Sequence, residues 1–583
     1  MLARFLAPIS FTIFVGLGIC GPSLAQDAEF PEAASGMKEQ KGGSAASFMV
    51  AAANPIAVQA GYNAIKAGGN ALDAAFATQL VLNLVEPQSS GIGGGAFVLY
   101  WDNKDKKIYA YDGRETAPAT ATEGRFLKSN GEAMLRNEAI IGGKSVGVPG
   151  LLRMMELAHK AHGEISWSTL FSPAIEVAAN GFELSPRLFR LLELDKSLPS
   201  IKTPAEHYYG ADGLPKPVGT VLRNAEMADT LTRLANEGAD TFYSGSLAQA
   251  IVLEVQNAEK NPGDLSLEDL HSYRARERTP LCAPYHQFIV CGAPAPTSGG
   301  IGVIQTLGIL EKFDLRNMEP WSPEVVHLFV EASRLVYADR AAFIADPDFV
   351  DIPERILVDR EYLKERANLI DPFSRIDQAE AGIPSQKGIF DYAPGQSPER
   401  PSTTHISVID SHGNAASMTS SIEGAFGSHL MVGGFLLNNQ LTDFSYTSVA
   451  DGRTVANRVE GGKRPRSSMA PIIVFDKNDN IVAVSGSPGG MAIVPLVSKT
   501  LIAMLDWGLT PQGATNLPNV LIFGQSVVID DGVFFAEHKK YLEALGHRVR
   551  RGNFPSGVHA IAIRDGVLLG GADPRREGTV MGE

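Results

Sequence analysis

A threonine lies where a segment without hydrophobic periodicity meets the first of several β-rich segments, and its hydroxyl is a candidate nucleophile. The junction reads Pro401-Ser402-Thr403-Thr404-His405, and alternating residues follow it. A threonine that begins a strand is ordinary, because β-branched residues favour strands. The sequence has no zincin motif and no phosphate-binding loop, which gives no support to a metalloprotease or an NTPase. The chemistry of Thr403 therefore has to be judged from the rest of the chain.

Short sequence blocks surround this junction in a fixed order. The blocks are residues 86–87, 89–95, 112–115, 298–300, 337–340, 346–349, 424–428, 436–445, 463–471, 486–490 and 573–575. One such block would be weak evidence for any family. Together, and in this order, the blocks resemble those of the γ-glutamyltranspeptidase family. That family is part of the N-terminal-nucleophile hydrolase superfamily. The resemblance covers nearly the whole chain after its first 25 residues.

The resemblance implies that the chain cleaves itself between Ser402 and Thr403. The Thr403 hydroxyl would attack the carbonyl of Ser402, and water would hydrolyse the resulting ester. A large subunit of residues 26–402 and a small subunit of residues 403–583 would then form a heterodimer. The α-amine freed on Thr403 would have a pKa of about 7.7–8.0, so it could take the proton of its own hydroxyl. One residue would thus supply both nucleophile and base.

Two further roles follow from the resemblance. Gly489 and Gly490 match the pair whose backbone N–H groups stabilise the oxyanion, each donor contributing roughly 2.7–4 kcal/mol. A glycine lets those N–H groups approach closely, because it has no Cβ. Ser421 falls where the family has a threonine whose hydroxyl supports the nucleophile, and serine keeps that hydroxyl.

A γ-glutamyl group ends in one ammonium and one carboxylate, so its recognition needs complementary charges. Arg114 can hold the carboxylate through two parallel hydrogen bonds, and the hydroxyls of Ser467 and Ser468 can add donors. Asp443, helped by Gln440, can hold the ammonium. Glu423 stands where many family members have asparagine, and it can accept from the same ammonium. The expected substrates are therefore small γ-glutamyl compounds such as glutathione.

One segment departs from the family pattern. Residues 446–462 are shorter than the lid-bearing loop of the best-known members, and Tyr446 lies too close to a strand end to be assigned as the lid tyrosine. A reduced lid should admit bulkier substrates and more water. The sequence therefore supports hydrolysis more strongly than it supports efficient transpeptidation, and it does not give the ratio of the two.

The elements that must position these residues can be outlined from the pattern. Asn54-Pro55 begins a helix that ends near residues 68–69, and Asn70 caps a buried helix over residues 71–85. Residues 149–345 are mostly helical, and residues 378–401 form an exposed linker. Strands are predicted at residues 96–101, 404–410, 415–421, 471–475, 481–485, 558–563 and 567–571, with a helix at residues 492–505. The resemblance implies an α+β fold, a four-layer αββα sandwich in which both subunits interleave in one domain.

The first 25 residues predict an export signal. Arg4 precedes an almost wholly apolar run over residues 5–20, and Ser23-Leu24-Ala25 supplies small residues for cleavage after Ala25. A buried helix and a membrane anchor are the less favoured alternatives, since the run is short for a full span. We expect a periplasmic or secreted protein without stable membrane insertion. The formal charge of -14 argues against nucleic acid as a partner.

Cys282 and Cys291 are the cysteines that remain after signal cleavage. They flank residues 284–290, which we interpret as one arm of a hairpin. The two residues can pair in an oxidising compartment, and two separate buried thiols are nearly as compatible with the sequence. No histidine or acidic cluster accompanies them, so we expect neither a metal site nor another cofactor.

Three hypotheses follow for the function. The first is a γ-glutamyl hydrolase and transferase. The second is the same machinery used on another amide, such as a glutaryl or cephalosporin side chain or poly-γ-glutamate. Asp443 and Glu423 discriminate between these two, because together they make sense only if a cation binds. The third hypothesis is an unprocessed, non-enzymatic envelope protein.

Overall fold

The structure is a computed structural model that describes residues 40–384, 391–395, 397, 402–552, 554 and 556–583. The predicted export signal, residues 1–25, lies outside the described residues. No helix in the part of the chain that is described is both long and apolar enough to cross a membrane.

Two seven-stranded antiparallel sheets form the centre of the molecule. The first contains, in order, β1 (Gly43–Ala45), β22 (Val567–Ala572), β21 (His559–Arg564), β17 (Ile481–Gly486), β16 (Ile472–Asp476), β9 (Phe288–Gly292) and β8 (Leu281–Tyr285). The second contains β23 (Thr579–Gly582), β2 (Met49–Ala52), β10 (Thr404–Ile409), β11 (Ala415–Ser421), β3 (Gly95–Asp102), β4 (Lys107–Asp112) and β7 (Arg276–Arg278). Each sheet thus combines strands from before and after the junction at Ser402 and Thr403.

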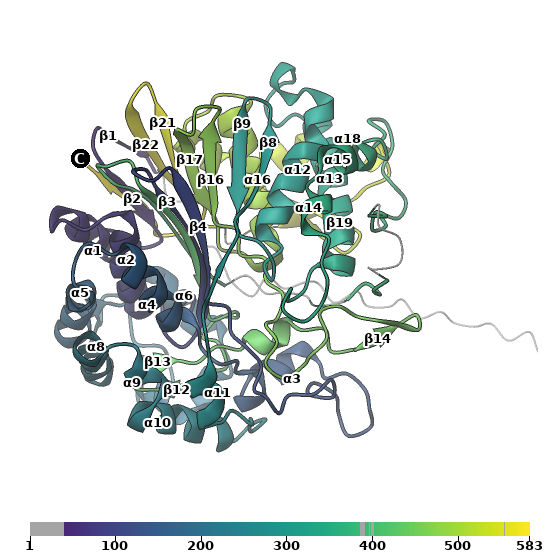
Figure 1. Cartoon of the computed structure of the whole chain (residues 1–583). Coiled ribbons are helices and arrows are strands. Elements are labelled where there is room, and N and C mark those ends of the chain that lie inside the picture. The colour runs from purple at the N-terminus through teal and green to yellow at the C-terminus, as the bar shows by residue number, and fades with distance from the viewer. Residues whose placement is uncertain (1–39, 385–390, 396, 398–401, 553, 555) are drawn as a thin grey trace, which may run out of the picture.

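Helices cover the outer face of each sheet, which gives four layers (Figure 1). The helices α1 (Pro55–Lys66) and α2 (Ala71–Val85) pack on the second sheet, and α12 (Gly299–Leu310), α13 (Pro323–Phe343) and α16 (Ile493–Leu505) lie over the first. Side chains of β3 alternate accordingly: Val98 joins the core under α2, and Phe97 joins the core between the sheets. The predicted α+β αββα sandwich is confirmed.

The sequence signals that predicted the first two helices act as expected. The Asn54 side chain accepts from the backbone N–H of Ile56, and Pro55 occupies the first turn of α1. Asn70 forms a capping box with Asp73 at the start of α2. Every residue of α2 is buried, which agrees with its apolar composition.

Residues 149–345 are mostly helical, as predicted, and most of them lie in the segment between β4 and β8. Its helices are α3 (Arg136–Ile140), α4 (Leu151–His162), α5 (Trp167–Asn180), α6 (Pro186–Leu194), α7 (Lys202–Tyr208), α8 (Ala225–Glu237), α9 (Asp240–Tyr243), α10 (Gly245–Gln256) and α11 (Leu267–Ser272). The later helices are α14 (Glu354–Leu357), α15 (Arg360–Ala367), α17 (Pro511–Asn516) and α18 (Val533–Ala544). Short strand pairs join β5 (Phe182–Glu183) to β6 (Val221–Leu222), β12 (Met431–Val432) to β13 (Phe435–Leu436) and β14 (Val449–Ala450) to β15 (Arg453–Thr454).

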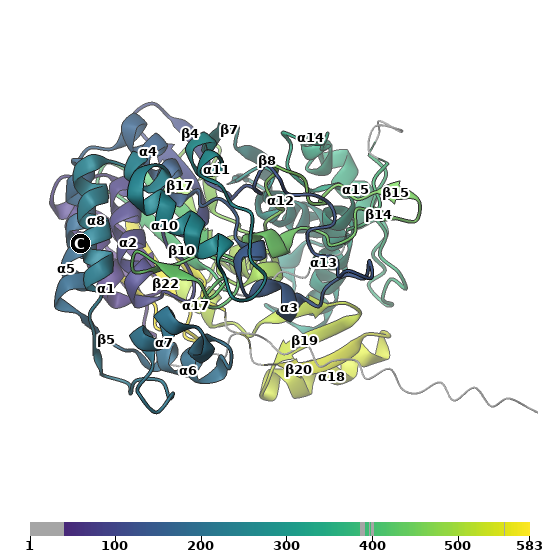
Figure 2. The same cartoon turned by 90° about the horizontal axis from the view of Figure 1, so that it is seen from below.

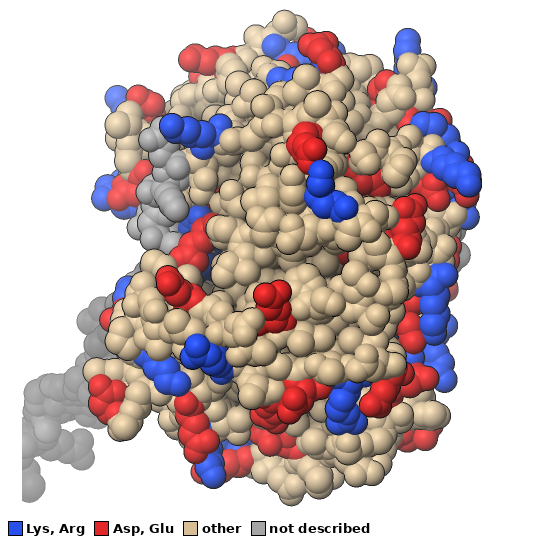
Figure 3. All heavy atoms as spheres, turned by 90° about the vertical axis from the view of Figure 1, so that its left-hand side faces the viewer, with Lys and Arg blue, Asp and Glu red and all other residues tan. Residues whose placement is uncertain are grey.

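A small third sheet lies at one edge of the molecule (Figure 2). It contains β18 (Val520–Phe523), β19 (Ser526–Asp530) and β20 (Arg548–Gly552), and with α18 it packs on α13. On the face shown in Figure 3, basic side chains are interspersed with acidic ones, and no continuous basic field covers that face.

The cysteine region differs from its prediction in one respect. Residues 284–290 are not one arm of a hairpin, because the chain turns at His286, whose φ is 50°, between β8 and β9. Cys282 and Cys291 face each other directly across these two strands and form a disulfide with a Cα–Cα distance of 4.1 Å. The structure therefore contains a disulfide rather than two separate buried thiols.

The predicted exposed linker, residues 378–401, lies partly outside the described residues. Where it is described, the prediction is wrong at several positions. Ala393 is fully buried and bridges to Val455, and Ser397 is buried and accepts a hydrogen bond from Arg466. The small side chains of Ala393 and Ser397 fit these buried positions, although the Gly/Pro-rich composition of residues 378–401 is typical of a loose linker.

Candidate active site

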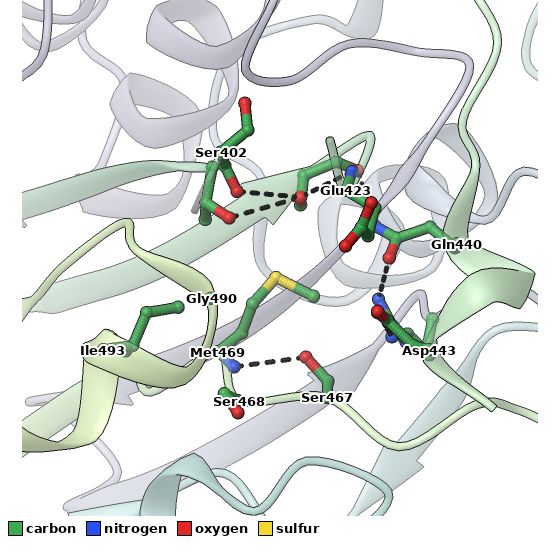
Figure 4. Close-up of a pocket in the computed structure, with 12 residues that line it drawn as sticks. Ser402, Glu423, Gln440, Asp443, Ser467, Ser468, Met469, Gly490 and Ile493 are labelled. Atoms are coloured by element: carbon green, nitrogen blue, oxygen red, sulfur yellow. Dashed lines mark hydrogen bonds and ion pairs between the residues drawn. The ribbon is translucent and has the colours of Figure 1, made fainter. Parts of the chain in front are cut away.

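A pocket lies at the ends of β10 and β11 and encloses about 230 Å³ of empty space, part of it open to solvent. Figure 4 shows Gly490 and Ile493 on one side of it and Gln440 and Asp443 on the other. The lining residues are Arg114, Ser402, Thr403, Ser421, Glu423, Gln440, Asp443, Ser467, Ser468, Met469, Gly490 and Ile493. The structure therefore brings together residues from four of the quoted blocks, 112–115, 436–445, 463–471 and 486–490, with the junction at Ser402 and Thr403 and with Ser421 and Glu423. Gly489 precedes the lining residue Gly490, and the cysteine pair lies elsewhere, on β8 and β9.

The strand ladder places Thr403 beside Ser421. Thr404 of β10 pairs with Ser420 of β11, so the residues just beyond them meet at the next position. The Thr403 hydroxyl donates to Ser421 Oγ at 3.2 Å, and Ser421 Oγ lies 3.4 Å from the carbonyl oxygen of Ser402. Both hydroxyls are buried. A candidate nucleophile, a second hydroxyl and the carbonyl of the preceding residue thus form one small cluster.

Contacts from distant segments hold this junction in place. The Ser402 hydroxyl donates to the carbonyl of Gln88 at 2.8 Å. Arg576 Nη1 donates to the carbonyl of Thr403 at 3.0 Å. Neither Gln88 nor Arg576 was named as a site residue, because single polar residues outside the quoted blocks give no signal in one sequence. They fix the backbone on both sides of the peptide bond that joins Ser402 to Thr403.

Gly489 and Gly490 form the turn that leads from β17 to α16. Their φ values are 137° and 54°, and side-chain-bearing residues rarely adopt such conformations. The turn continues as a short 3-10 helix, Gly490–Ala492, directly before α16. Backbone N–H groups at a helix start carry partial positive charge, and Gly490 lines the pocket. This turn can therefore stabilise developing negative charge.

Arg114 is held by several acceptors of the protein itself. Its guanidinium donates to Asp443 Oδ2 at 2.6 Å, to Gln440 Oε1 at 2.6 Å and to the carbonyls of Pro465 and Arg466. The Arg114 side chain is only 1% exposed. Arg114 and Asp443 had been expected to bind opposite ends of a substrate, and the structure shows that they are also ion-paired with each other.

A second arginine, which the sequence analysis did not identify, reaches the same carboxylates. Arg136 of α3 contacts Glu423 Oε1, lies 3.3 Å from Asp443 Oδ1 and donates to the carbonyl of Thr442 at 3.0 Å. Burial lowers the pKa of Arg136, but the two carboxylates raise it by more, so its pKa lies above the usual value. Asp443 is thus placed between two guanidinium groups.

Ser467 and Ser468 are positioned by blocks that precede them by more than a hundred residues. Ser298 donates through both its backbone N–H and its hydroxyl to the carbonyl of Ser467, at 2.8 Å in each case. Arg340 of α13 donates to Ser468 Oγ at 3.1 Å and to Ser298 Oγ at 3.0 Å. The residue blocks at 298–300 and 337–340 therefore support the pocket from behind.

Glu115 is a fully buried carboxyl next to the pocket. Burial raises its pKa to about 8, although the adjacent Arg114, 3.6 Å away, lowers it. Gly95 of β3 makes room for this side chain, because a Cβ at Gly95 would lie 2.7 Å from Glu115 Oε2. The interior beside Arg114 therefore favours a neutral carboxyl at and below neutral pH.

Two other sequence features lie outside this cluster. Residues 143–147 have the Gly-x-Ser-x-Gly spacing of a nucleophile elbow, but Ser145 is buried and its hydroxyl donates to the carbonyls of Ile140 and Gly142. Tyr446 stacks on Phe126 with ring centroids 4.6 Å apart, and the following residues form the projecting hairpin of β14 and β15 (Figure 1). Within the described ranges, no three His, Cys, Asp or Glu side chains are grouped to hold a metal ion.

Comparisons with known proteins agree with this arrangement. The family model described as Gamma-glutamyltranspeptidase matches residues 57–583. The chain is 36% identical over 545 residues to the glutathione hydrolase proenzyme of Bacillus subtilis strain 168, covering 92% of this chain and 91% of that protein. It is 35% identical over 542 residues to the glutathione hydrolase proenzyme of Escherichia coli K12, covering 90% of each.

A solved structure shows the same overall fold. The crystal structure of cephalosporin acylase from Bacillus halodurans superposes with a TM-score of 0.82 at 27% identity, covering 94% of this chain and 97% of that one. Family model, relatives and fold agree along most of the sequence, and the resemblance stated from the sequence is confirmed. The chain belongs to the γ-glutamyltranspeptidase family.

Proposed function

We propose that this chain is the precursor of a γ-glutamyl hydrolase and transferase that cleaves itself before Thr403 and acts on glutathione and related γ-glutamyl amides. The observation that carries the proposal is the contact of the Thr403 hydroxyl with Ser421 Oγ at 3.2 Å, inside a pocket that contains Arg114 and Asp443. The names of the relatives, glutathione hydrolase proenzymes, support both the substrate and the self-processing.

Self-cleavage begins with the Thr403 hydroxyl. Its oxygen attacks the carbonyl carbon of Ser402, so that a C–O bond forms and the C–N bond of the peptide breaks. Ser421 Oγ, which lies 3.2 Å from the Thr403 hydroxyl and 3.4 Å from the carbonyl oxygen of Ser402, passes the hydroxyl proton toward the departing nitrogen. Water then hydrolyses the ester and leaves a carboxylate on Ser402 and a free α-amine on Thr403.

Turnover uses the new amine as the base. With a pKa of about 7.7–8.0 in model compounds, an α-amine accepts a proton near neutral pH. Thr403 Oγ1 then attacks the γ-glutamyl carbonyl, and the N–H groups of Gly489 and Gly490 stabilise the oxyanion. The amine leaving group departs with the proton, and water or an amino acid attacks the γ-glutamyl ester on Thr403.

The charged end of the substrate binds on the ion pair between Arg114 and Asp443. The α-carboxylate joins the guanidinium of Arg114 with help from Ser467 and Ser468. The α-ammonium joins Asp443, with Glu423 and Gln440 beside it. A zwitterionic substrate fits this subsite, because its carboxylate meets the positive charge of Arg114 and its ammonium meets the negative charge of Asp443.

The two products of cleavage remain together as a heterodimer in this proposal. Residues 403–583 supply β10 and β11, and these strands pair with β2 and β3 of the preceding residues. Separating the chains would break the second sheet at its centre and expose the core beneath it.

The proposal also includes export to the periplasm or the medium, with removal of residues 1–25. The short segment 446–462 favours hydrolysis over transfer.

Maturation and activity of a single-residue variant test the proposal. The full chain should yield two bands, one for each subunit, with Thr403 as the first residue of the smaller, and it should release p-nitroaniline from γ-glutamyl-p-nitroanilide. Thr403→Ala should stay as one band and be inactive. Thr404→Val is the matched control, because it removes the neighbouring buried hydroxyl and keeps the β-branched shape. A Thr403→Ala variant that still matures and turns over would contradict the proposal, and an uncut, inactive wild-type chain would favour the non-enzymatic alternative.

A further inference from the structure

A cation already occupies the carboxylates that are expected to bind the substrate ammonium. Arg136 Nη2 contacts Glu423 Oε1 and lies 3.3 Å from Asp443 Oδ1. These are the two acidic side chains that line the pocket, and they are 3% and 4% exposed in the two ion pairs. The guanidinium therefore satisfies the same acceptors that an α-ammonium would use.

The position of Arg136 is fixed by its surroundings. Its Nη1 donates to the carbonyl of Thr442 at 3.0 Å, and its side chain is 12% exposed. The helix α3 that carries it begins with a backbone cap, in which the Glu138 side chain accepts from the N–H of Leu135 at 3.0 Å. An arginine stays charged at all working pH values. The subsite thus contains a permanent, anchored positive charge.

An incoming α-ammonium has to share these carboxylates with Arg136 or displace it. Two positive charges on the same pair of acceptors repel each other strongly in a buried pocket. An acyl group with a methylene in place of the amino-bearing carbon meets no such repulsion, and its terminal carboxylate can still reach Arg114 and the two serines. The positive charge of Arg136 therefore reduces the gain in binding free energy that an α-amino group on the substrate would otherwise bring.

We propose that Arg136 is a specificity-determining residue that occupies the ammonium subsite, so that the pocket also accepts acyl groups that end in a carboxylate and carry no α-amino group, such as glutaryl amides. The inference deepens the proposed function, on which it rests, by naming a second substrate class for the same site. Because Arg136 supplies a cation, the buried carboxylates of Glu423 and Asp443 are paired even when the substrate carries no ammonium.

The kinetic test compares two substrates that differ only at the α-carbon. The ratio of kcat/KM for γ-glutamyl-p-nitroanilide to that for glutaryl-p-nitroanilide is measured for mature wild-type enzyme and for Arg136→Gln, which keeps a donor toward Thr442 and loses the charge. The variant should raise this ratio at least tenfold, mainly through a lower KM for the γ-glutamyl substrate. An unchanged or lowered ratio would overturn the proposal. Arg453→Gln is the control, because it removes an exposed arginine paired with Asp391 on the β14–β15 hairpin and should change the ratio less than twofold.

Binding to the wild-type enzyme keeps the inference testable if Arg136→Gln does not mature. Calorimetric titration with L-glutamate and with glutarate should give dissociation constants within tenfold of each other. L-Glutamate binding more than a hundredfold tighter than glutarate would show that the resident cation does not compete. These titrations need no turnover, so they remain informative even if the wild-type chain fails to hydrolyse γ-glutamyl-p-nitroanilide, which is the outcome that contradicts the proposed function instead.

Discussion

The hydroxyl of Thr403 lies 3.2 Å from that of Ser421, at the position where the ladder of β10 and β11 would place its next residue pair. The two strands are joined by a tight turn in which Asp410 accepts from the backbone N–H groups of His412 and Asn414. This hairpin lies entirely after residue 402. Cleavage before Thr403 therefore leaves the geometry of the nucleophile and its neighbour intact.

Ser421 should act in both maturation and turnover. In Ser421→Ala the Thr403 hydroxyl loses its partner, and we expect self-cleavage and hydrolysis each to slow by roughly 10²-fold, at the low end of the range for positioned proton transfer. Ser421→Thr keeps the hydroxyl and should remain within a few-fold of wild type. Band intensities over time and the steady-state hydrolysis rate measure the two effects. Wild-type rates for Ser421→Ala would rule out this role.

The strands around the nucleophile were predictable because their signals are local. Alternation over residues 404–410 and 415–421, with polar residues between them, gave a hairpin whose observed limits are Thr404–Ile409 and Ala415–Ser421. The caps at Asn54 and Asn70 likewise begin helices as predicted. The four-layer arrangement came from the family resemblance, and the order of the strands in each sheet was not predicted, since local patterns do not specify which strands pair across the chain.

Contacts between distant charged residues were not predictable. Arg136 meets Glu423 across 287 positions, and it lies in a short helix that carries no recognised motif. The ion pair of Arg114 with Asp443 spans 329 positions, and the sequence assigned each residue only to the substrate. Opposite charges that converge on one buried pocket pair with each other first, because an unpaired buried charge is costly. Only the fold reveals such partners.

Gly489 should be intolerant of any side chain. Its φ of 137° is rarely adopted by alanine, so Gly489→Ala should move the backbone N–H groups of the turn and lower kcat by about 10²–10³-fold, the loss expected for one oxyanion donor. Gly508→Ala is the control, since Gly508 has a φ of 64° and no neighbouring atom within 4 Å of an added Cβ. Both variants are compared by kcat and by thermal unfolding. Equal, small losses of kcat in both would indicate that Gly489 serves only as a turn.

Arg114→Ala should act on the α-carboxylate of the substrate. We expect kcat/KM for γ-glutamyl-p-nitroanilide to fall at least a hundredfold, because the guanidinium that meets the α-carboxylate is lost. The loss on 4-aminobutyryl-p-nitroanilide, which has no α-carboxylate, should be much smaller. The variant should also lose up to about 3 kcal/mol in its free energy of unfolding, because Asp443 keeps Arg136 but loses its closest partner. Equal kinetic losses on the two substrates would contradict the carboxylate clasp.

Glu115 should make stability depend on pH between about 5 and 8. Burial raises its pKa to about 8 in the folded chain, against about 4.3 for an unfolded glutamate. Between these values the folded chain keeps a proton that the unfolded chain releases, so the stability linked to neutral Glu115 is full below about pH 4 and is lost as pH rises toward 8.

Glu115→Gln tests this dependence, because glutamine cannot ionise and keeps the same shape. Its free energy of unfolding relative to wild type should increase with pH from 5 to 8, by up to about 1.4 kcal/mol per pH unit. The difference in melting temperature between the two proteins, measured at each pH, reports this change, and other titrating groups cancel in the comparison. Melting temperatures that run parallel over this range would show that Glu115 is ionised in the folded chain, and Arg114 would then hold two carboxylates, Glu115 and Asp443, rather than one.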